Sequence, residues 1–217
     1  MSIITIRGQL GSGAPEIGKQ VASRLQADYI DRQIIAEVAA RLDRQEQEVI
    51  AKEMPPSSLL GRIAEALGHG LAFGDGTAGA YLPIEQIPLD DARYLKALES
   101  VVRELARSRS QPLVILGRGS QFILKDYPGS LHVLTVAPLE VRVKRVMENL
   151  KVDRESAKLE IARFDNSLQA FSKKYFKAEL EDPVHYDLVI NTARFNFQAT
   201  ASMVVDAISL KDQPTSK

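Results

Sequence analysis

The residues best suited to binding a ligand lie near the start of the chain, in the glycine-rich segment Gly8–Gly13 (GQLGSG). This segment directly follows a run of β-branched and aliphatic residues and precedes a stretch with helical periodicity. Glycines in such a turn let the backbone adopt positive φ and point N–H groups at an anion, and the following helix adds partial positive charge. The segment therefore predicts a phosphate-binding loop whose cofactor-binding residues are Gly8, Gly11, Ser12 and Gly13.

The loop departs from the pattern G-x-x-x-x-G-K-[S/T] in its second half. Ala14 stands where lysine is expected, and Pro15 stands where Ser or Thr would bind Mg²⁺. Pro15 suits the first turn of a helix, but it removes one N–H from the anion site. Lys19 lies four residues after Pro15 and therefore on the same helix face, one turn further along. It could replace the missing lysine in binding the cofactor, or it could be a solvated surface residue. The pattern predicts ATP with Mg²⁺ as the cofactor, at a site that Ala14 and Pro15 weaken.

Two other interpretations of the glycines stay open. They could simply form a tight turn between a strand and a helix. Alternatively, Gly11 and Gly13, with Asp31 about 20 residues downstream, match part of a dinucleotide-binding pattern. The third glycine of that pattern would fall at Glu16, whose bulk and charge fit poorly there. The sequence therefore favours a phosphate loop over a dinucleotide site.

Three arginines are candidates for binding phosphate, because the planar guanidinium matches pairs of phosphate oxygens. Arg118 lies between two glycines, directly after a buried apolar run. That position is at the carboxyl edge of an open α/β sheet, where ligands bind. Arg142 and Arg145 lie three residues apart on a predicted helix that also carries Glu140 and Glu148, so surface ion pairs are the alternative for these two.

Short apolar runs with little alternation predict strands that are buried on both faces, as in a parallel sheet. Amphipathic stretches separate them, and the order strand, helix, strand predicts an α/β fold with a parallel sheet of about five strands flanked by helices. An aspartate, Asp43, followed by Glu46 indicates a helix N-cap. The expected strands cover 2–7, 28–30, 112–116, 131–136 and 187–191, and the expected helices cover 15–26, 31–40, 43–52, 90–109, 138–150, 153–177 and 196–210.

Composition sets broad limits on the protein class. The 217 residues contain 28 Lys plus Arg and 28 Asp plus Glu, so net charge favours neither nucleic acid nor a membrane surface. Cysteine is absent, which excludes thiol chemistry and disulfides, and the three histidines show no metal-ligand spacing. No apolar run is long enough for a signal peptide or a membrane helix. We expect one cytoplasmic domain over 1–210 with a long loop at Gly68–Pro88 and a polar tail at 211–217, and a homodimer is left open.

Several later segments, taken in order with the opening GxxGSG, resemble the cytidylate kinase-like family of nucleoside monophosphate kinase relatives. The resemblance covers roughly residues 1–205 and is carried by GRG at 117–119, LEVRVKRVM at 139–147, RFD at 163–165, KK at 173–174 and YDLVINT at 186–192. It implies a P-loop nucleotide kinase core with a lid at about 151–182 and a helical insertion at about 41–91.

The resemblance also implies roles for individual residues. Catalytic roles fall to Arg118, Arg163 and Lys173, substrate-binding roles to Asp31, Arg118 and Asp165, and further cofactor-binding roles to Arg142 and Arg145. Two departures accompany the changes at 14 and 15. Gly119 stands where the kinases have aspartate, and no acidic residue ends the strand at 112–116. The catalytic implication is therefore weaker than the implication for the fold.

Three functions follow from these observations. The leading one is transfer of a phosphoryl group from ATP to a nucleoside monophosphate or another small acceptor. The second is a pseudo-kinase that binds nucleotide or phosphate without turnover, which Ala14 and Pro15 favour. The third and weakest is an NAD-binding oxidoreductase. The retained arginines favour the kinase over the other two.

Overall fold

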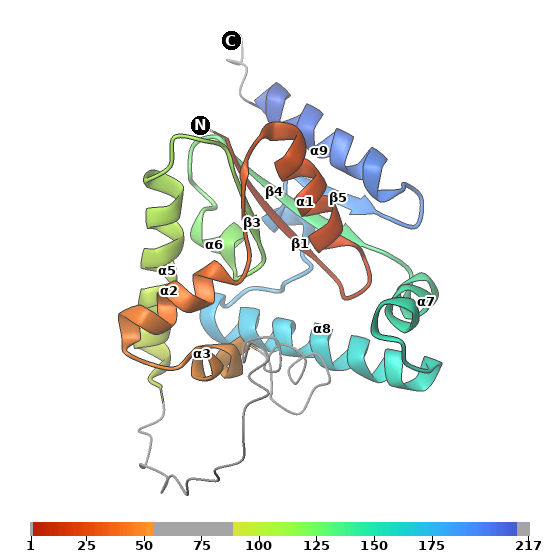
Figure 1. Cartoon of the computed structure of the whole chain (residues 1–217), viewed down its shortest axis with the longest axis horizontal. Coiled ribbons are helices and arrows are strands. Elements are labelled where there is room, and N and C mark those ends of the chain that lie inside the picture. Colours follow the sequence, from red (N-terminus) through yellow and green to blue (C-terminus); the bar gives the residue numbers. More distant parts are fainter. Residues whose placement is uncertain (1, 54–88, 212–217) are drawn as a thin grey trace, which may run out of the picture.

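The sheet is the organising element of the fold. The computed structural model describes residues 2–53 and 89–211. Its strands are β1 (Ile3–Gly8), β2 (Asp28–Ile30), β3 (Leu113–Leu116), β4 (Ser130–Val136) and β5 (Leu188–Asn191). They pair in parallel in the order β2-β3-β1-β4-β5 (Figure 1). The predicted α/β fold, a parallel sheet of about five strands flanked by helices, is confirmed.

The helices cover both faces of the sheet. They are α1 (Ala14–Leu25), α2 (Gln33–Leu42), α3 (Glu46–Glu53), α5 (Asp91–Arg107), α6 (Ser120–Ile123), α7 (Leu139–Leu150), α8 (Arg154–Phe176) and α9 (Phe197–Lys211), with a 3-10 turn at Pro183–His185. Ile4 and Ile6 of β1 face a core formed with α1 and α9, whereas Ile3 faces a core formed with α2 and α5. Side chains alternate between faces along a strand, so β1 contributes to both cores.

Helix α8 lies across the carboxyl end of the sheet and completes the site region (Figure 1). It runs for 23 residues, and Asp153 at its N-cap accepts the N–H of Ser156 at 2.9 Å. Phe171 and Tyr175 near its end enter the same core as α2 and α5. This anchoring places the middle of α8 beside the loop that follows β1.

The start of α3 differs from the prediction. Asp43 is not the N-cap of a helix over 43–52; its φ of 53° puts it in the left-handed region, where it ends α2. Aspartate tolerates this conformation at a helix C-terminus better than most residues. The predicted loop Gly68–Pro88 and the tail beyond residue 211 lie outside the described residues. The insertion at 41–91 and the lid at 151–182 stay predictions. In the described part of the chain, no helix combines the length and apolar character needed to cross a membrane.

Lowering the pH from 7 to 5 is expected to destabilise the protein through His132 on β4. This side chain is 6% exposed, with Nδ1 2.8 Å from the Thr5 hydroxyl and Nε2 3.2 Å from that of Ser130. Burial lowers its pKa below the ordinary 6.5, and the charge of Asp187 opposes this only in part. Below pH 6.5 the unfolded chain binds a proton that the folded one resists, so stability falls by up to about 1.4 kcal/mol per pH unit.

Urea unfolding at pH 7, 6 and 5 measures this effect. The variant His132→Gln should flatten the profile, because amide groups can occupy the same hydrogen bonds without titrating. Asp187, whose pKa is lowered from 3.8, titrates below this window. An equal slope in both proteins would contradict the assignment to His132.

Candidate functional site

The glycine loop joins β1 to α1, and its shape depends on glycine. Gly11 and Gly13 have φ of 84° and 89°, in the left-handed region that favours glycine. A Cβ on Gly13 would lie 2.3 Å from the ring of Phe197. A Cβ on Gly8 would lie 2.2 Å from the hydroxyl oxygen of Ser12. The segment therefore forms a turn as tight as a phosphate loop requires.

Two of the loop amides are available to a ligand. Gly11 and Gly13 line a cavity of about 510 Å³, and within the described part of the chain their N–H groups have no acceptor. Ser12 differs, because its N–H donates to the Gln9 carbonyl at 2.9 Å and its buried hydroxyl lies 2.8 Å from that of Thr135. Ser12 therefore attaches the loop to β4 and directs neither group at the cavity.

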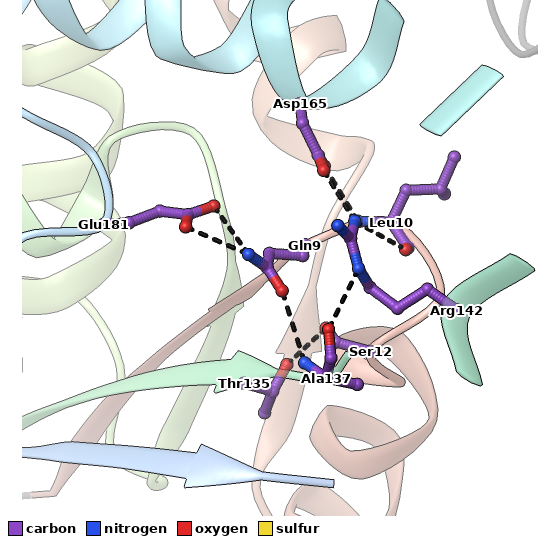
Figure 2. Close-up of polar contacts among 8 residues, drawn as sticks. All are labelled: Gln9, Leu10, Ser12, Thr135, Ala137, Arg142, Asp165 and Glu181. Carbon is purple, nitrogen blue, oxygen red and sulfur yellow. Dashed lines mark hydrogen bonds and ion pairs between the residues drawn. The ribbon is translucent and has the colours of Figure 1, made fainter. Parts of the chain in front are cut away.

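Helices α7 and α8 hold the loop from one side through Arg142 and Asp165 (Figure 2). The Asp165 carboxylate accepts the N–H of Leu10 at 3.1 Å and lies 2.6 Å from Nη1 of Arg142. Arg142 is 8% exposed and also donates from Nε to the Ala137 carbonyl at 3.1 Å. Neither charged side chain lines the cavity. Their contacts make them groups that position the loop.

Arg145 joins the loop to the end of β5. Its Nη1 donates to the Gly11 carbonyl at 3.1 Å and to the Thr192 hydroxyl at 2.9 Å, and its Nη2 donates to the Thr192 carbonyl at 2.8 Å. The guanidinium also lies 4.9 Å from the centre of the Phe197 ring. Arg145 also lines the 510 Å³ cavity. It therefore both holds the loop and can contact a ligand there.

A second cavity of about 380 Å³ adjoins the first at the carboxyl end of the sheet. Both are bounded by the end of β1, the end of β3 and the middle of α8. The residues that line both are Arg7, Leu10, Pro15, Leu116, Gly117, Phe164 and Leu168. The loop glycines Gly11 and Gly13 line the first cavity, and Arg118 and Asp31 line the second.

Arg118 is the charged centre of the second cavity. It has φ of 60° between two glycines that also have positive φ, so three consecutive residues turn in the left-handed region. The guanidinium forms ion pairs with Glu53 and, at 3.6 Å, with Asp31. Glu53 is 5% exposed and also accepts the hydroxyl of Tyr94 at 3.0 Å. Burial lowers the pKa of Arg118, while the Asp31 charge opposes that change.

Comparison with known proteins decides the family. The sequence model of the cytidylate kinase-like family matches residues 3–194. This chain belongs to the cytidylate kinase-like family. The cytidylate kinase of Haloarcula marismortui is 25% identical over 207 residues, which cover 95% of this chain and 88% of that protein. A uronate isomerase of Corynebacterium glutamicum is 28% identical over 109 residues, and this match covers 50% of this chain but 21% of that protein.

Solved structures agree with the family at the level of the fold. An uncharacterized protein from Eubacterium ventriosum gives a TM-score of 0.68 at 18% identity, covering 96% of this chain and 99% of that one. The shikimate kinase of Bacteroides thetaiotaomicron gives a TM-score of 0.51 at 11% identity, with 96% and 98% covered. The parallel sheet with its loop after β1 is thus a P-loop kinase fold.

The candidate site gathers only some of the residues singled out in the sequence. Lys19 is exposed on α1, Lys173 pairs with Glu179 at 2.9 Å, and Arg163 pairs with Glu160 at 3.4 Å. None of the three cations lines either cavity. Their catalytic and cofactor-binding roles stay predictions, as do the roles expected for Arg142 and Asp165, whose side chains hold the loop.

Other residues of the candidate site were missed in the sequence. Arg7 lines both cavities, and Arg32, Glu53 and Gln121 line the second. Arg7 had a usable signal, because a charged residue ends the buried strand directly before the glycine loop. Glu53 had none, since it meets Arg118 only through the fold.

Proposed function

We propose that this protein binds ATP in the first cavity and transfers its terminal phosphoryl group to a nucleoside monophosphate in the second. The observation that carries the proposal is the pair of adjoining cavities. The first is lined by loop glycines whose N–H groups have no acceptor among the described residues, and the second is lined by Arg118. Phosphoryl transfer depends chiefly on placing donor and acceptor in line and on neutralising charge. Adjoining sites at one sheet edge support the first requirement.

Each cavity has groups suited to its ligand. The amides of Gly11 and Gly13, beside the start of α1, suit a donor phosphate. In the second cavity, the Arg118 guanidinium suits the acceptor phosphate, and the Asp31 carboxylate suits hydroxyl or amino groups of the acceptor. During transfer the acceptor oxygen bonds to the terminal phosphorus while the bond to the bridging oxygen of ADP breaks. The middle of α8, with Phe164 and Leu168, borders both cavities and limits water there.

The donor set fits the phosphates better than it fits a protein-held metal. Pro15 has no hydroxyl, and the Ser12 hydroxyl is turned toward Thr135. Within residues 2–53 and 89–211, no cluster of three or more acidic, His or Cys side chains could hold a metal ion. The loop itself therefore offers no side-chain ligand for Mg²⁺ at the position where P-loop kinases provide one.

Calorimetric titration with ATP, ADP and CMP, together with ADP release across a panel of nucleoside monophosphates, tests the proposal. We expect binding of ATP and turnover with at least one acceptor. ATP binding without turnover for any acceptor would favour a pseudo-kinase, for which Ala14 and Pro15 are the supporting observation. Binding of NAD(H) without ATP would instead favour an oxidoreductase.

The double variant Ala14→Lys/Pro15→Ser is expected to bind ATP roughly 10- to 100-fold more tightly, or to raise turnover by a similar factor. The physical reason is that a charge-assisted hydrogen bond to phosphate is worth about 1.5–3 kcal/mol. Both positions line the first cavity, so the new side chains would face the donor phosphates. Titration calorimetry and the ADP release assay measure the two effects.

Gln20→Lys is the matched control, because it adds the same charge to α1 at a residue that lines neither cavity. It should leave ATP affinity within about twofold. If the double variant changes neither affinity nor turnover, Gly8–Gly13 does not act as a phosphate loop.

A further inference from the structure

Arg7 occupies an unusual place at the end of β1. It is the last residue before Gly8 and is 6% exposed. By the alternation along the strand it lies on the face of Ile3 and Thr5, away from α1 and α9. It lines both the 510 Å³ and the 380 Å³ cavity. Arg7 therefore lies at the junction of the two sites.

The guanidinium of Arg7 lacks the partners that a buried charge needs. Its Nε and Nη2 atoms are inaccessible to water and form no hydrogen bond with any described residue. The carboxylates whose charge acts on Arg7 are those of Glu181 and Asp165, and both already accept hydrogen bonds from other residues. Glu181 accepts two bonds from Nε2 of Gln9, at 3.0 and 3.1 Å, and Asp165 accepts from Arg142 and Leu10 (Figure 2).

The buried charge of Arg7 is not fully compensated within the protein. Burial lowers the pKa of Arg7, and the surrounding Tyr186, Glu181 and Asp165 oppose that change only in part. A charge removed from water without a hydrogen-bonded partner destabilises a fold, whereas pairing it with an anion reverses the effect. Guanidinium groups bind phosphate oxygens in pairs, and the N–H groups at Nε and Nη2 of Arg7 have no acceptor among the described residues. Arg7 is thus suited to an anion that arrives at the junction.

We propose that Arg7 binds the phosphoryl group in transit between the two cavities and supplies the positive charge that Ala14 leaves missing from the loop. This inference rests on the proposed function. The loop glycines line only the first cavity and Arg118 only the second, so Arg7 is the cation common to both among the described residues. The group that belongs to the junction is the one that moves, which ATP carries and ADP lacks.

Two measurements on Arg7→Met test the inference. In thermal unfolding without ligand, the variant should melt about 3–10 °C above the wild type, because it removes an unpaired buried charge. Inorganic pyrophosphate should raise the melting temperature of the wild type clearly more than that of the variant, in which only the loop amides remain to bind it. In titrations, Arg7→Met should weaken binding of a non-hydrolysable ATP analogue by roughly 10- to 100-fold and that of ADP by less than about threefold.

Arg109→Met is the matched control. Arg109 pairs with Asp28, the first residue of β2, which lies at the end of the sheet away from the cavities, and Arg109 lines neither cavity. It should keep the pyrophosphate response of the wild type. Arg7→Lys retains the charge and should keep part of that response. If Arg7→Met does not fold, Arg7→Gln removes the charge with a polar side chain, and a smaller pyrophosphate response than in the wild type carries the same meaning.

The outcomes separate this inference from the proposed function. Equal stabilisation of the wild type and Arg7→Met by pyrophosphate would overturn the role of Arg7 and leave nucleotide binding intact. A pyrophosphate response that depends on Arg7, with no binding of ATP or ADP, would support the anion site and overturn the nucleotide proposal. Absence of any pyrophosphate response in the wild type would overturn the inference directly.

Discussion

Gly13→Ala is expected to abolish ATP binding and to lower the free energy of unfolding by about 2–6 kcal/mol. Two costs combine in this loss. Holding a non-glycine residue at φ of 89° costs about 1–3 kcal/mol, and overpacking against a neighbour adds about 1–3 kcal/mol. The neighbour is the ring of Phe197, 2.3 Å from the position that the new methyl group would take. That ring is held in turn by Arg145, which also bonds the Gly11 carbonyl. Relief of the clash would therefore disturb the loop that carries the phosphate amides.

Gly117→Ala is the matched control for the backbone cost alone. Gly117 has φ of 67°, but a Cβ there would meet nothing within 4 Å. Its expected loss is about 1–2 kcal/mol, the strain of a left-handed residue without a clash. In the Phe197→Ala background, Gly13→Ala should cost only the backbone part of its loss, because the ring that the methyl group would meet is gone. Urea unfolding measures these variants and Phe197→Ala alone, and equal losses for Gly13→Ala and Gly117→Ala would refute the packing argument.

The elements of this fold could be predicted because they are encoded locally. The run at 2–7 is apolar on both faces, and the structure places β1 at the centre of the sheet with a core on each side. Gly11 and Gly13 specify a tight turn through positive φ, and Gly8 allows the close approach of Ser12 because it has no side chain. Arg118 could be placed at the sheet edge since it directly follows a buried strand.

The contacts that complete the site could not be predicted, because they join segments far apart in the sequence. Glu53 meets Arg118 across 65 positions, and Asp165 meets Leu10 across 155. The unpaired state of Arg7 depends on Glu181 and Asp165 being engaged elsewhere. A one-dimensional pattern shows which residues are charged, but not which charges have already found partners.

Arg118→Met is expected to lower the free energy of unfolding by about 3–5 kcal/mol, because it leaves the Glu53 carboxylate buried without its cation. Glu53 is 5% exposed, and among the described residues its other polar contact is the hydroxyl of Tyr94 at 3.0 Å. The backbone at 118 keeps φ of 60° with either side chain, so strain does not change between the two proteins. In thermal unfolding this loss corresponds to a decrease of about 6–20 °C.

The double variant Arg118→Met/Glu53→Met separates the structural role of Arg118 from its role toward the acceptor. Replacing both charges removes the unpaired carboxylate, so stability should return to within about 1 kcal/mol of the wild type, and the coupling in the double-mutant cycle should be large. Binding of CMP, measured by titration, should stay weakened in the double variant, because the acceptor phosphate would still lack its guanidinium. Recovery of CMP binding along with stability would show that Arg118 serves the fold alone. The Arg118–Glu53 pair would then be a structural bridge between α3 and the sheet edge, and the acceptor phosphate would need another cation of the second cavity, of which Arg32 is the first candidate.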